Sequence, residues 1–142
     1  MNILFITWDG PQTSYLEGLF IPIFKKLNEH GYRMHILQFT WADEDIVSHV
    51  KSVSEKAGIP YRSAPVRRSM GSVGPLASAF LGSRHIRRAV RDWSIDTLMP
   101  RSLMPALAVV ATGSNRGLRL VFDADGFAAD ERVDFGGLSK KA

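Results

Sequence analysis

The sequence predicts an α/β fold: a Rossmann-like, open parallel sheet with helices on both faces. Short apolar segments typical of buried strands alternate along the chain with amphipathic helical segments. The connections between these segments are short, as in a doubly wound sheet. The first strand is apolar at nearly every position, which is typical of a strand buried on both faces. With 142 residues, the chain is expected to form a single domain over residues 1–142.

Residues 2–8 are almost all apolar or β-branched and predict a central, buried strand. The Asp-Gly-Pro sequence at 9–11 ends it. Residues 14–30 carry apolar side chains at helical spacing, so they predict an amphipathic helix that stops at Gly31. Pro22 lies inside this segment and is expected to kink the helix or to mark a late start. The apolar positions are Leu16, Leu19, Phe20, Ile23, Phe24 and Leu27.

A second strand is predicted over residues 32–39, where apolar side chains first alternate and then become continuous. Residues 41–58 predict a second helix, because the acidic residues 43–45 favour the positive end of a helix dipole. Residues 60–66 predict a short third strand. The stretch 67–74 is rich in Ser, Gly and Arg and predicts a loop.

The second half predicts a long helix over residues 76–93, interrupted near Gly82, and a short strand over 96–99. An apolar helix over 105–111 and an apolar strand over 118–122 follow. This order extends the alternation of strands and helices to five strands. The side chains expected in the core include Ile3, Phe5, Leu19, Ile23, Leu27, Ile36, Leu107, Val121 and Phe122.

Several functional classes are excluded by what the sequence lacks. It has no cysteine, which rules out disulfides, thiolate metal sites and cysteine nucleophiles. Its four histidines show no metal-ligand spacing, so no metal site is expected. The dinucleotide, P-loop and nucleophile-elbow fingerprints are all missing. There is no signal-peptide pattern and no apolar run long enough to span a membrane, so the protein is expected to be cytoplasmic.

Candidate ligand-binding residues follow the predicted strands at their carboxyl ends. In a doubly wound sheet, ligands bind at these ends, next to the point where the strand order reverses. We therefore expect the loops 9–14, 100–102 and 123–127 to converge on one cleft, although the same residue types also occur in ordinary turns. The candidate site residues are Asp9, Gly10, Pro11, Gln12, Arg101, Ser102, Asp125 and Gly126.

The positive charge of the chain is concentrated in one segment. Residues 62–101 hold eight arginines but only two acidic residues, Asp92 and Asp96. Four of these arginines lie at i, i+3, i+4 and i+7 of a predicted helix and therefore share a face. The face is either simply solvated or an anion site for phospholipid headgroups or a lipid-diphosphate acceptor, provided that the two aspartates leave it unpaired. Nucleic acid is not an expected partner, because aromatic interleaving is missing. The four are Arg84, Arg87, Arg88 and Arg91.

Two segments resemble motifs of a known family. Residues 99–108, MPRSLMPALA, are similar to a strand exit of the form H-A-R-S-x-x-P, with Met99 in place of His. Residues 121–132, VFDADGFAADER, are similar to V-F-D-x-R-G-F-x-x-D-E-R, with Asp125 in place of Arg. Residues 31–37 also match a position where this family often has G-H-x-V. Together these segments resemble the N-terminal domain of retaining GT-B glycosyltransferases.

The resemblance implies that the chain is one half of a GT-B fold, truncated from a longer two-domain enzyme. The N-terminal domain of that family receives the acceptor, and a C-terminal domain binds the nucleotide-sugar donor. The position of Asp125 touches the transferred sugar in the family, which makes Asp125 the catalytic candidate. The family generally needs no metal and no cofactor, because positive side chains and helix N-termini neutralise the leaving diphosphate.

The function implied is transfer of a hexosyl group from a nucleotide-sugar to a lipid-linked or polysaccharide acceptor, at the inner face of the membrane. The isolated chain is then expected to be inactive, and a second Rossmann-like domain in the full-length protein would be its partner. The alternative is a non-catalytic, flavodoxin-like module that binds a ligand or partner and carries a basic membrane-surface patch. A receiver-type module is disfavoured, because only Asp9 stands where an acidic pair is needed.

Overall fold

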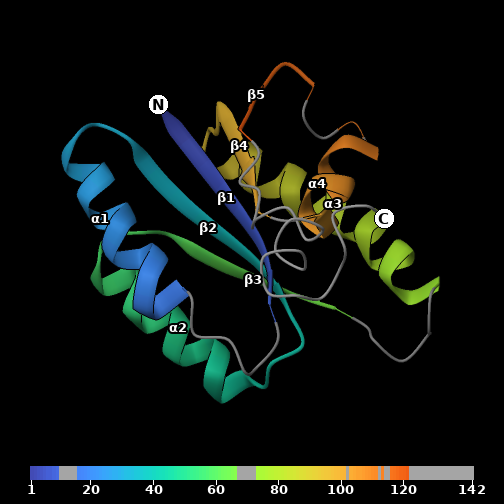
Figure 1. Cartoon of the computed structure of the whole chain (residues 1–142), viewed down its shortest axis with the longest axis horizontal. Helices are drawn as coiled ribbons and strands as arrows, with labels where there is room; N and C mark the ends of the chain where they lie inside the picture. The colour runs from blue at the N-terminus through green and yellow to red at the C-terminus, as the bar shows by residue number, and fades with distance from the viewer. Residues whose placement is uncertain (10–15, 67–72, 102, 112, 114–115, 122–142) are drawn as a thin grey trace, which may run out of the picture.

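The described part of the chain forms an all-parallel sheet of five strands in the order β3-β2-β1-β4-β5 (Figure 1). This confirms the predicted Rossmann-like α/β fold. The computed structural model describes residues 1–9, 16–66, 73–101, 103–111, 113 and 116–121. The strands are β1 (Asn2–Asp9), β2 (Arg33–Thr40), β3 (Tyr61–Pro65), β4 (Thr97–Pro100) and β5 (Arg119–Leu120). The helices are η1 (Leu16–Phe20), α1 (Ile21–Glu29), α2 (Glu44–Lys56), α3 (Val73–Asp92) and α4 (Leu103–Ala111).

Strand β1 lies at the centre of the sheet, as predicted. It pairs with β2 along its whole length and with β4 on its other side. Leu4, Phe5 and Ile6 are fully buried. Because successive side chains of a strand point to opposite faces, this apolar run supplies both cores of the domain at once.

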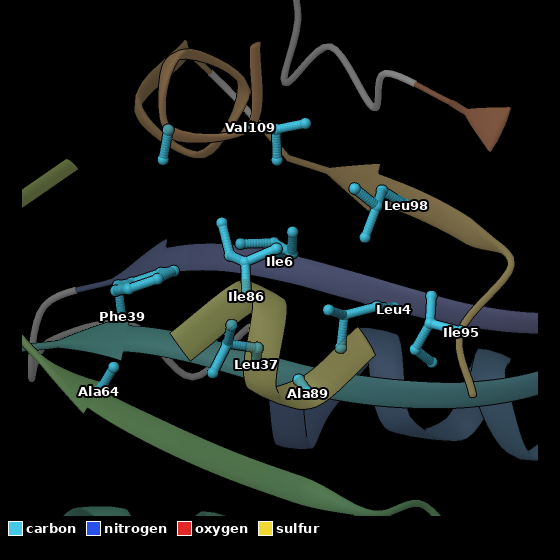
Figure 2. Close-up of a cluster of buried hydrophobic side chains, with 11 residues drawn as sticks. Leu4, Ile6, Leu37, Phe39, Ala64, Ile86, Ala89, Ile95, Leu98 and Val109 are labelled. Carbon is cyan, nitrogen blue, oxygen red and sulfur yellow. The ribbon is translucent and has the colours of Figure 1, made fainter. Parts of the chain in front are cut away.

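One core lies between the sheet and helices α3 and α4 (Figure 2). Leu4 and Ile6 of β1 face it, and Ile86 and Ala89 of α3 cover them together with Val109 of α4. All five side chains are completely buried. The apolar stripe of α3 therefore packs on the sheet and leaves the charged side of the helix toward solvent.

The other core lies between the sheet and helices α1 and α2 (Figure 1). Phe5 of β1 packs edge-on against Phe24 of α1, with ring centroids 5.0 Å apart. Its ring also lies 4.8 Å from the ring of Phe20, at the end of η1. Ile36 of β2 and Val50 of α2 complete this layer. Helices thus cover both faces of the sheet.

The segment 16–29 is helical, and the late start expected at Pro22 is confirmed, but two of the positions expected in the core are wrong. Its first part is the π-helical turn η1, and the α-helix starts only at Ile21, with Pro22 in its first turn. A π-helix has a wider turn than an α-helix, so the buried stripe passes from Leu16 to Ile21. Leu19 and Ile23, which were expected in the core, are therefore 48% and 45% exposed.

The predicted strand over 118–122 is also shorter than expected. Among the described residues 118–121, only Arg119–Leu120 is a strand, and it lies beside β4. Val121 still donates its backbone N–H to Leu98 O at 2.9 Å, but its side chain is 51% exposed rather than part of the core. An edge strand has a neighbour on one side only, which leaves its side chains less covered. The side chain of Leu107 and residue Phe122 lie outside the described residues.

Helix α2 begins at Glu44 and not at residue 41, because Asp43 caps it: Ile46 N donates to Asp43 Oδ1 at 3.0 Å. Helix α3 begins at Val73, so the predicted loop over 67–74 ends earlier than expected. Ile3 and Leu27, two of the expected core residues, are half-buried. These differences shift boundaries and leave the order of elements unchanged.

Gly82 does not interrupt α3, which runs continuously through it. It lies where the helix crosses Phe39 of β2. A Cβ atom at this position would stand 2.8 Å from Phe39 Cε1, closer than van der Waals contact allows. The Phe39 ring is buried and stacks on Trp8, with centroids 5.4 Å apart, so it has little room to move. Gly82 is therefore a close-approach residue and not a helix breaker.

We expect Gly82→Ala to lower the free energy of unfolding by about 1–2 kcal/mol. Overpacking destabilises a core by about 1–3 kcal/mol, whereas the better helix propensity of Ala stabilises the helix by up to about 1 kcal/mol. Urea unfolding measures the difference. Gly18→Ala is the matched control, because nothing lies within 4 Å of its added Cβ in η1. Equal stability of the two variants would contradict the close-approach role of Gly82.

His35 of β2 is a buried ionisable group in the α3 core. Its Nδ1 lies 3.2 Å from Ile3 O, and its ring lies 5.3 Å from the Trp93 ring. Burial is the main cause that lowers the pKa of His35, and the hydrogen bond to Ile3 opposes it only in part. The folded chain therefore holds this imidazole neutral under conditions in which the unfolded chain protonates it.

Acidification from about pH 7.5 to about pH 5 is expected to destabilise the fold. Below the ordinary histidine pKa of 6.5, His35 binds a proton in the unfolded state more readily than in the folded state, where its pKa is lowered. Stability consequently rises with pH across this range. His35→Gln should reduce the loss, as measured by urea unfolding at both pH values. His49→Gln, which removes an exposed histidine of α2, is the control. An unchanged pH dependence in His35→Gln would refute the assignment.

Candidate functional site

The strand order reverses between β1 and β4, so the expected ligand site lies at the carboxyl ends of these two strands. Ile6 of β1 is the register partner of Pro100, the last residue of β4. Strand β1 continues beyond this pair to Asp9, beside Thr40 of β2. The exits of β1 and β4 are thus adjacent in space.

Arg101 is held at this point by its backbone and by its side chain. Its N–H donates to Ile6 O at 2.8 Å, which extends the β4 ladder by one residue. Its guanidinium carbon lies 4.8 Å from the centroid of the Phe20 ring. A cation over an aromatic face is attracted by the ring quadrupole. Because Phe20 itself packs on Phe5, the half-buried guanidinium is anchored to the core of the sheet.

On the opposite face of β1, Trp8 lies at the carboxyl end of the strand and stacks on Phe39. Its side chain is half-buried. The switch point therefore has an aromatic group on each side of the sheet, Trp8 on one and Phe20 on the other. This arrangement suits a ligand that presents both an anionic group and a stacking or apolar surface.

Of the other candidate site residues, the structure describes only the backbone of Asp9. The backbone of Asp9 ends β1 at the switch point. Gly10, Pro11, Gln12, Ser102, Asp125 and Gly126 lie outside the described residues. The convergence of the loops 9–14, 100–102 and 123–127 on one cleft stays a prediction. Phe20 was not among the predicted site residues, because its role depends on the π-helical turn that brings it beneath Arg101.

The four arginines of α3, Arg84, Arg87, Arg88 and Arg91, are all exposed. The condition that Asp92 leaves them unpaired is not met for Arg91, whose Nε lies 3.4 Å from Asp92 Oδ1. Arg62 Nη2 of β3 lies closer to this carboxylate, 3.0 Å from Oδ2. These contacts, first of all the one with Arg62, lower the pKa of Asp92. Exposed ion pairs of this kind contribute little to stability.

The Asp96 carboxylate is held by groups outside α3. It accepts hydrogen bonds from Asn2 N at 2.9 Å and from Thr97 Oγ1 at 2.7 Å. The contact with the Asn2 N–H is the main cause that lowers the pKa of Asp96. Asp96 therefore ties the start of β4 to the start of β1.

A hollow lies at the outer edge of β3, between α2 and α3. Its volume is about 570 Å³, and its lining includes Lys51, Arg62, His85, Arg88 and Asp92. The sequence pattern did not reveal it, because these residues come from three separate elements. The concentration of arginines between residues 62 and 101 was the only available signal.

Within the described ranges, no group of three or more His, Cys, Asp or Glu side chains is placed to hold a metal ion. No helix in the described part of the chain combines the length and the apolar character needed to cross a membrane.

Comparisons with known proteins support the fold. No protein-family model and no curated protein matches the chain. Among solved structures, it is similar to two crystal structures of the C-terminal domain of a hydrogenase from Pyrococcus furiosus. One gives a TM-score of 0.54 at 16% identity, covering 86% of this chain and 90% of that one. The other gives a TM-score of 0.59 at 14% identity, covering 85% of this chain and 89% of that one. At this identity the likeness concerns the α/β architecture alone.

Proposed function

We propose that this chain is the acceptor-binding domain of a glycosyltransferase, which transfers a sugar from a nucleotide-sugar to a lipid-linked or polysaccharide acceptor. The main support is Arg101: it belongs to the segment that resembles a GT-B strand exit, and it stands at the switch point with its guanidinium over Phe20. The parallel sheet with the order β3-β2-β1-β4-β5 is compatible with one half of a GT-B fold.

On this proposal, Arg101 binds an anionic group of the acceptor, such as the diphosphate of a lipid carrier. A guanidinium presents several donors in a rigid plane and suits phosphate oxygens. Asp125 would accept hydrogen bonds from sugar hydroxyls, and Gly10 would let the ligand approach the backbone closely. The nucleotide-sugar would be held mainly by a second domain, and closure of the two domains would complete the catalytic site.

The proposal predicts that the chain alone binds acceptors and not donors. A short-chain polyprenyl-diphosphate sugar should shift the NMR signals of residues at the carboxyl ends of β1 and β4. UDP-glucose and GDP-mannose should not bind below about 1 mM. Arg101→Gln should weaken acceptor binding about tenfold or more, because it removes a charge-assisted hydrogen bond.

Arg33→Gln is the matched control for Arg101→Gln. Arg33 is exposed at the amino end of β2, the end of the sheet remote from the switch point. Micromolar binding of a nucleotide-sugar by the chain would contradict the proposal, and so would acceptor binding that Arg101→Gln leaves unchanged.

The second candidate function is a non-catalytic ligand- or partner-binding module that docks on an anionic membrane surface at the cytoplasmic face. The observation that favours it is the exposure of all four arginines on α3. Each basic residue near such a surface contributes about 1 kcal/mol, so four of them give weak and reversible attachment. The paired Arg91 reduces this total and does not remove it, because its side chain stays 77% exposed.

This candidate predicts sedimentation of the chain with vesicles that contain phosphatidylglycerol, and weaker sedimentation as salt rises. Replacing Arg84, Arg87, Arg88 and Arg91 together by Gln should abolish it. The control replaces an equal number of exposed cations elsewhere on the surface, Lys25, Lys26, Arg33 and Lys56. If both variants sediment alike, or if the unaltered chain ignores these vesicles at low salt, α3 is not a membrane-binding face.

A further inference from the structure

The hollow at the edge of β3 is separate from the switch point. Strand β3 forms one edge of the sheet, and β2 lies between it and β1 (Figure 1). Three elements surround the hollow: Lys51 comes from α2, Arg62 and Ser63 from β3, and Arg88 from α3. A volume of about 570 Å³ is enough for a small molecule.

The lining of the hollow is cationic. Among the described residues, Lys51, Arg62 and Arg88 face it together with one carboxylate, that of Asp92. Lys51 Nζ also lies 4.0 Å from Glu55 Oε1 on the same helix, but both side chains are more than half exposed. Such a solvated pair is weak and leaves the ammonium available to a ligand.

The Arg62 side chain is fixed in position without any ligand. Its guanidinium carbon lies 4.5 Å from the centroid of the Trp93 ring, and Nη2 binds Asp92 Oδ2 at 3.0 Å. Its other terminal nitrogen, Nη1, is covered and has no hydrogen-bond partner among the described residues. A preordered guanidinium loses little entropy on binding.

Strand β3 adds polar groups to this cationic lining. Ile36 N donates to Pro60 O, and Val66 N donates to Thr40 O, so alternate residues of β3 direct their backbone toward β2. In a parallel pair this alternation turns the backbone N–H of Ser63 toward the outer edge. Ser63, an exposed residue, lines the same hollow.

His85 of α3 reports on the electrostatics of the hollow. Its half-buried ring meets the Phe39 ring edge-on at 6.3 Å. Burial and the positive charges of Arg88 and Arg84 lower the pKa of His85. The hollow therefore already has a positive potential that an anion would relieve.

We propose that this hollow binds a small phosphate-bearing anion. A phosphate group has several acceptor oxygens, and here donors approach from three sides: an ammonium from α2, a guanidinium and a serine from β3, and a second guanidinium from α3. The remaining volume accommodates the organic part that carries the phosphate. This inference does not depend on the proposed transferase function, since none of these residues lies at the switch point.

The test titrates the full chain with phenyl phosphate and with inorganic phosphate, followed by NMR and calorimetry. Saturable binding at or below about 1 mM is expected, with shifts of the Ser63 amide signal. The pKa of His85 should rise on binding, because the anion offsets repulsion from Arg88 and Arg84. Lys51→Gln and Arg88→Gln should each weaken binding at least fivefold. Lys56→Gln and Arg87→Gln are matched controls, since each removes an exposed cation from the same helix outside the lining.

A vesicle arm separates a soluble phosphate from a lipid headgroup. Vesicles of phosphatidylcholine with phosphatidic acid present the same phosphomonoester. If phenyl phosphate displaces the chain from these vesicles and Lys51→Gln abolishes attachment, the phosphate that the hollow binds belongs to a lipid headgroup. If phenyl phosphate binds but Lys51→Gln does not change vesicle attachment, the natural ligand of the hollow is a soluble phosphate ester. Absence of saturable binding in both arms up to about 10 mM, or binding indifferent to Lys51→Gln and Arg88→Gln, overturns the proposal.

Discussion

The burial of β1 on both faces is the constraint on which the rest of the structure depends. Its side chains alternate between two cores, so Leu4 and Ile6 require α3 and α4 above them while Phe5 requires α1 and α2 on the other side. Helices on both faces of a parallel sheet demand crossovers in both directions from this strand. The reversal of strand order next to β1 is the direct result, and it places the exits of β1 and β4 side by side.

The sequence predicted this architecture because each strand and helix carries its own periodicity. The apolar run over 2–8 indicated a central strand without any knowledge of its neighbours. The prediction failed where the outcome depends on a contact between distant segments. The π-helical turn changes which residues of 16–29 are buried, and Gly82 is explained only by the Phe39 ring across the core.

The candidate sites show the same difference between local sequence patterns and contacts of distant segments. Arg101 was predictable from its place after a strand, since the topology alone puts it at the switch point. Its cation–π contact with Phe20 was not predictable, because that contact joins the end of β4 to a π-helical turn far away in sequence. The hollow beside β3 was even less predictable from the sequence. Lys51, Arg62 and Arg88 have no common spacing, and only the packing of α2 and α3 against one edge strand brings them together.

Asp92 links the two basic regions of the molecule. Its carboxylate contacts Arg62 of the hollow and Arg91 of the exposed arginine face, and Arg88 belongs to both regions. An anion bound beside Arg62 competes with Asp92 for the same guanidinium and adds negative charge next to Arg88. Screening in physiological salt reaches only about 8 Å, so charges this close are still felt. If both proposals hold, a ligand in the hollow would weaken the positive potential of the α3 face, and an anionic surface on α3 would weaken the affinity of the hollow by the same free energy.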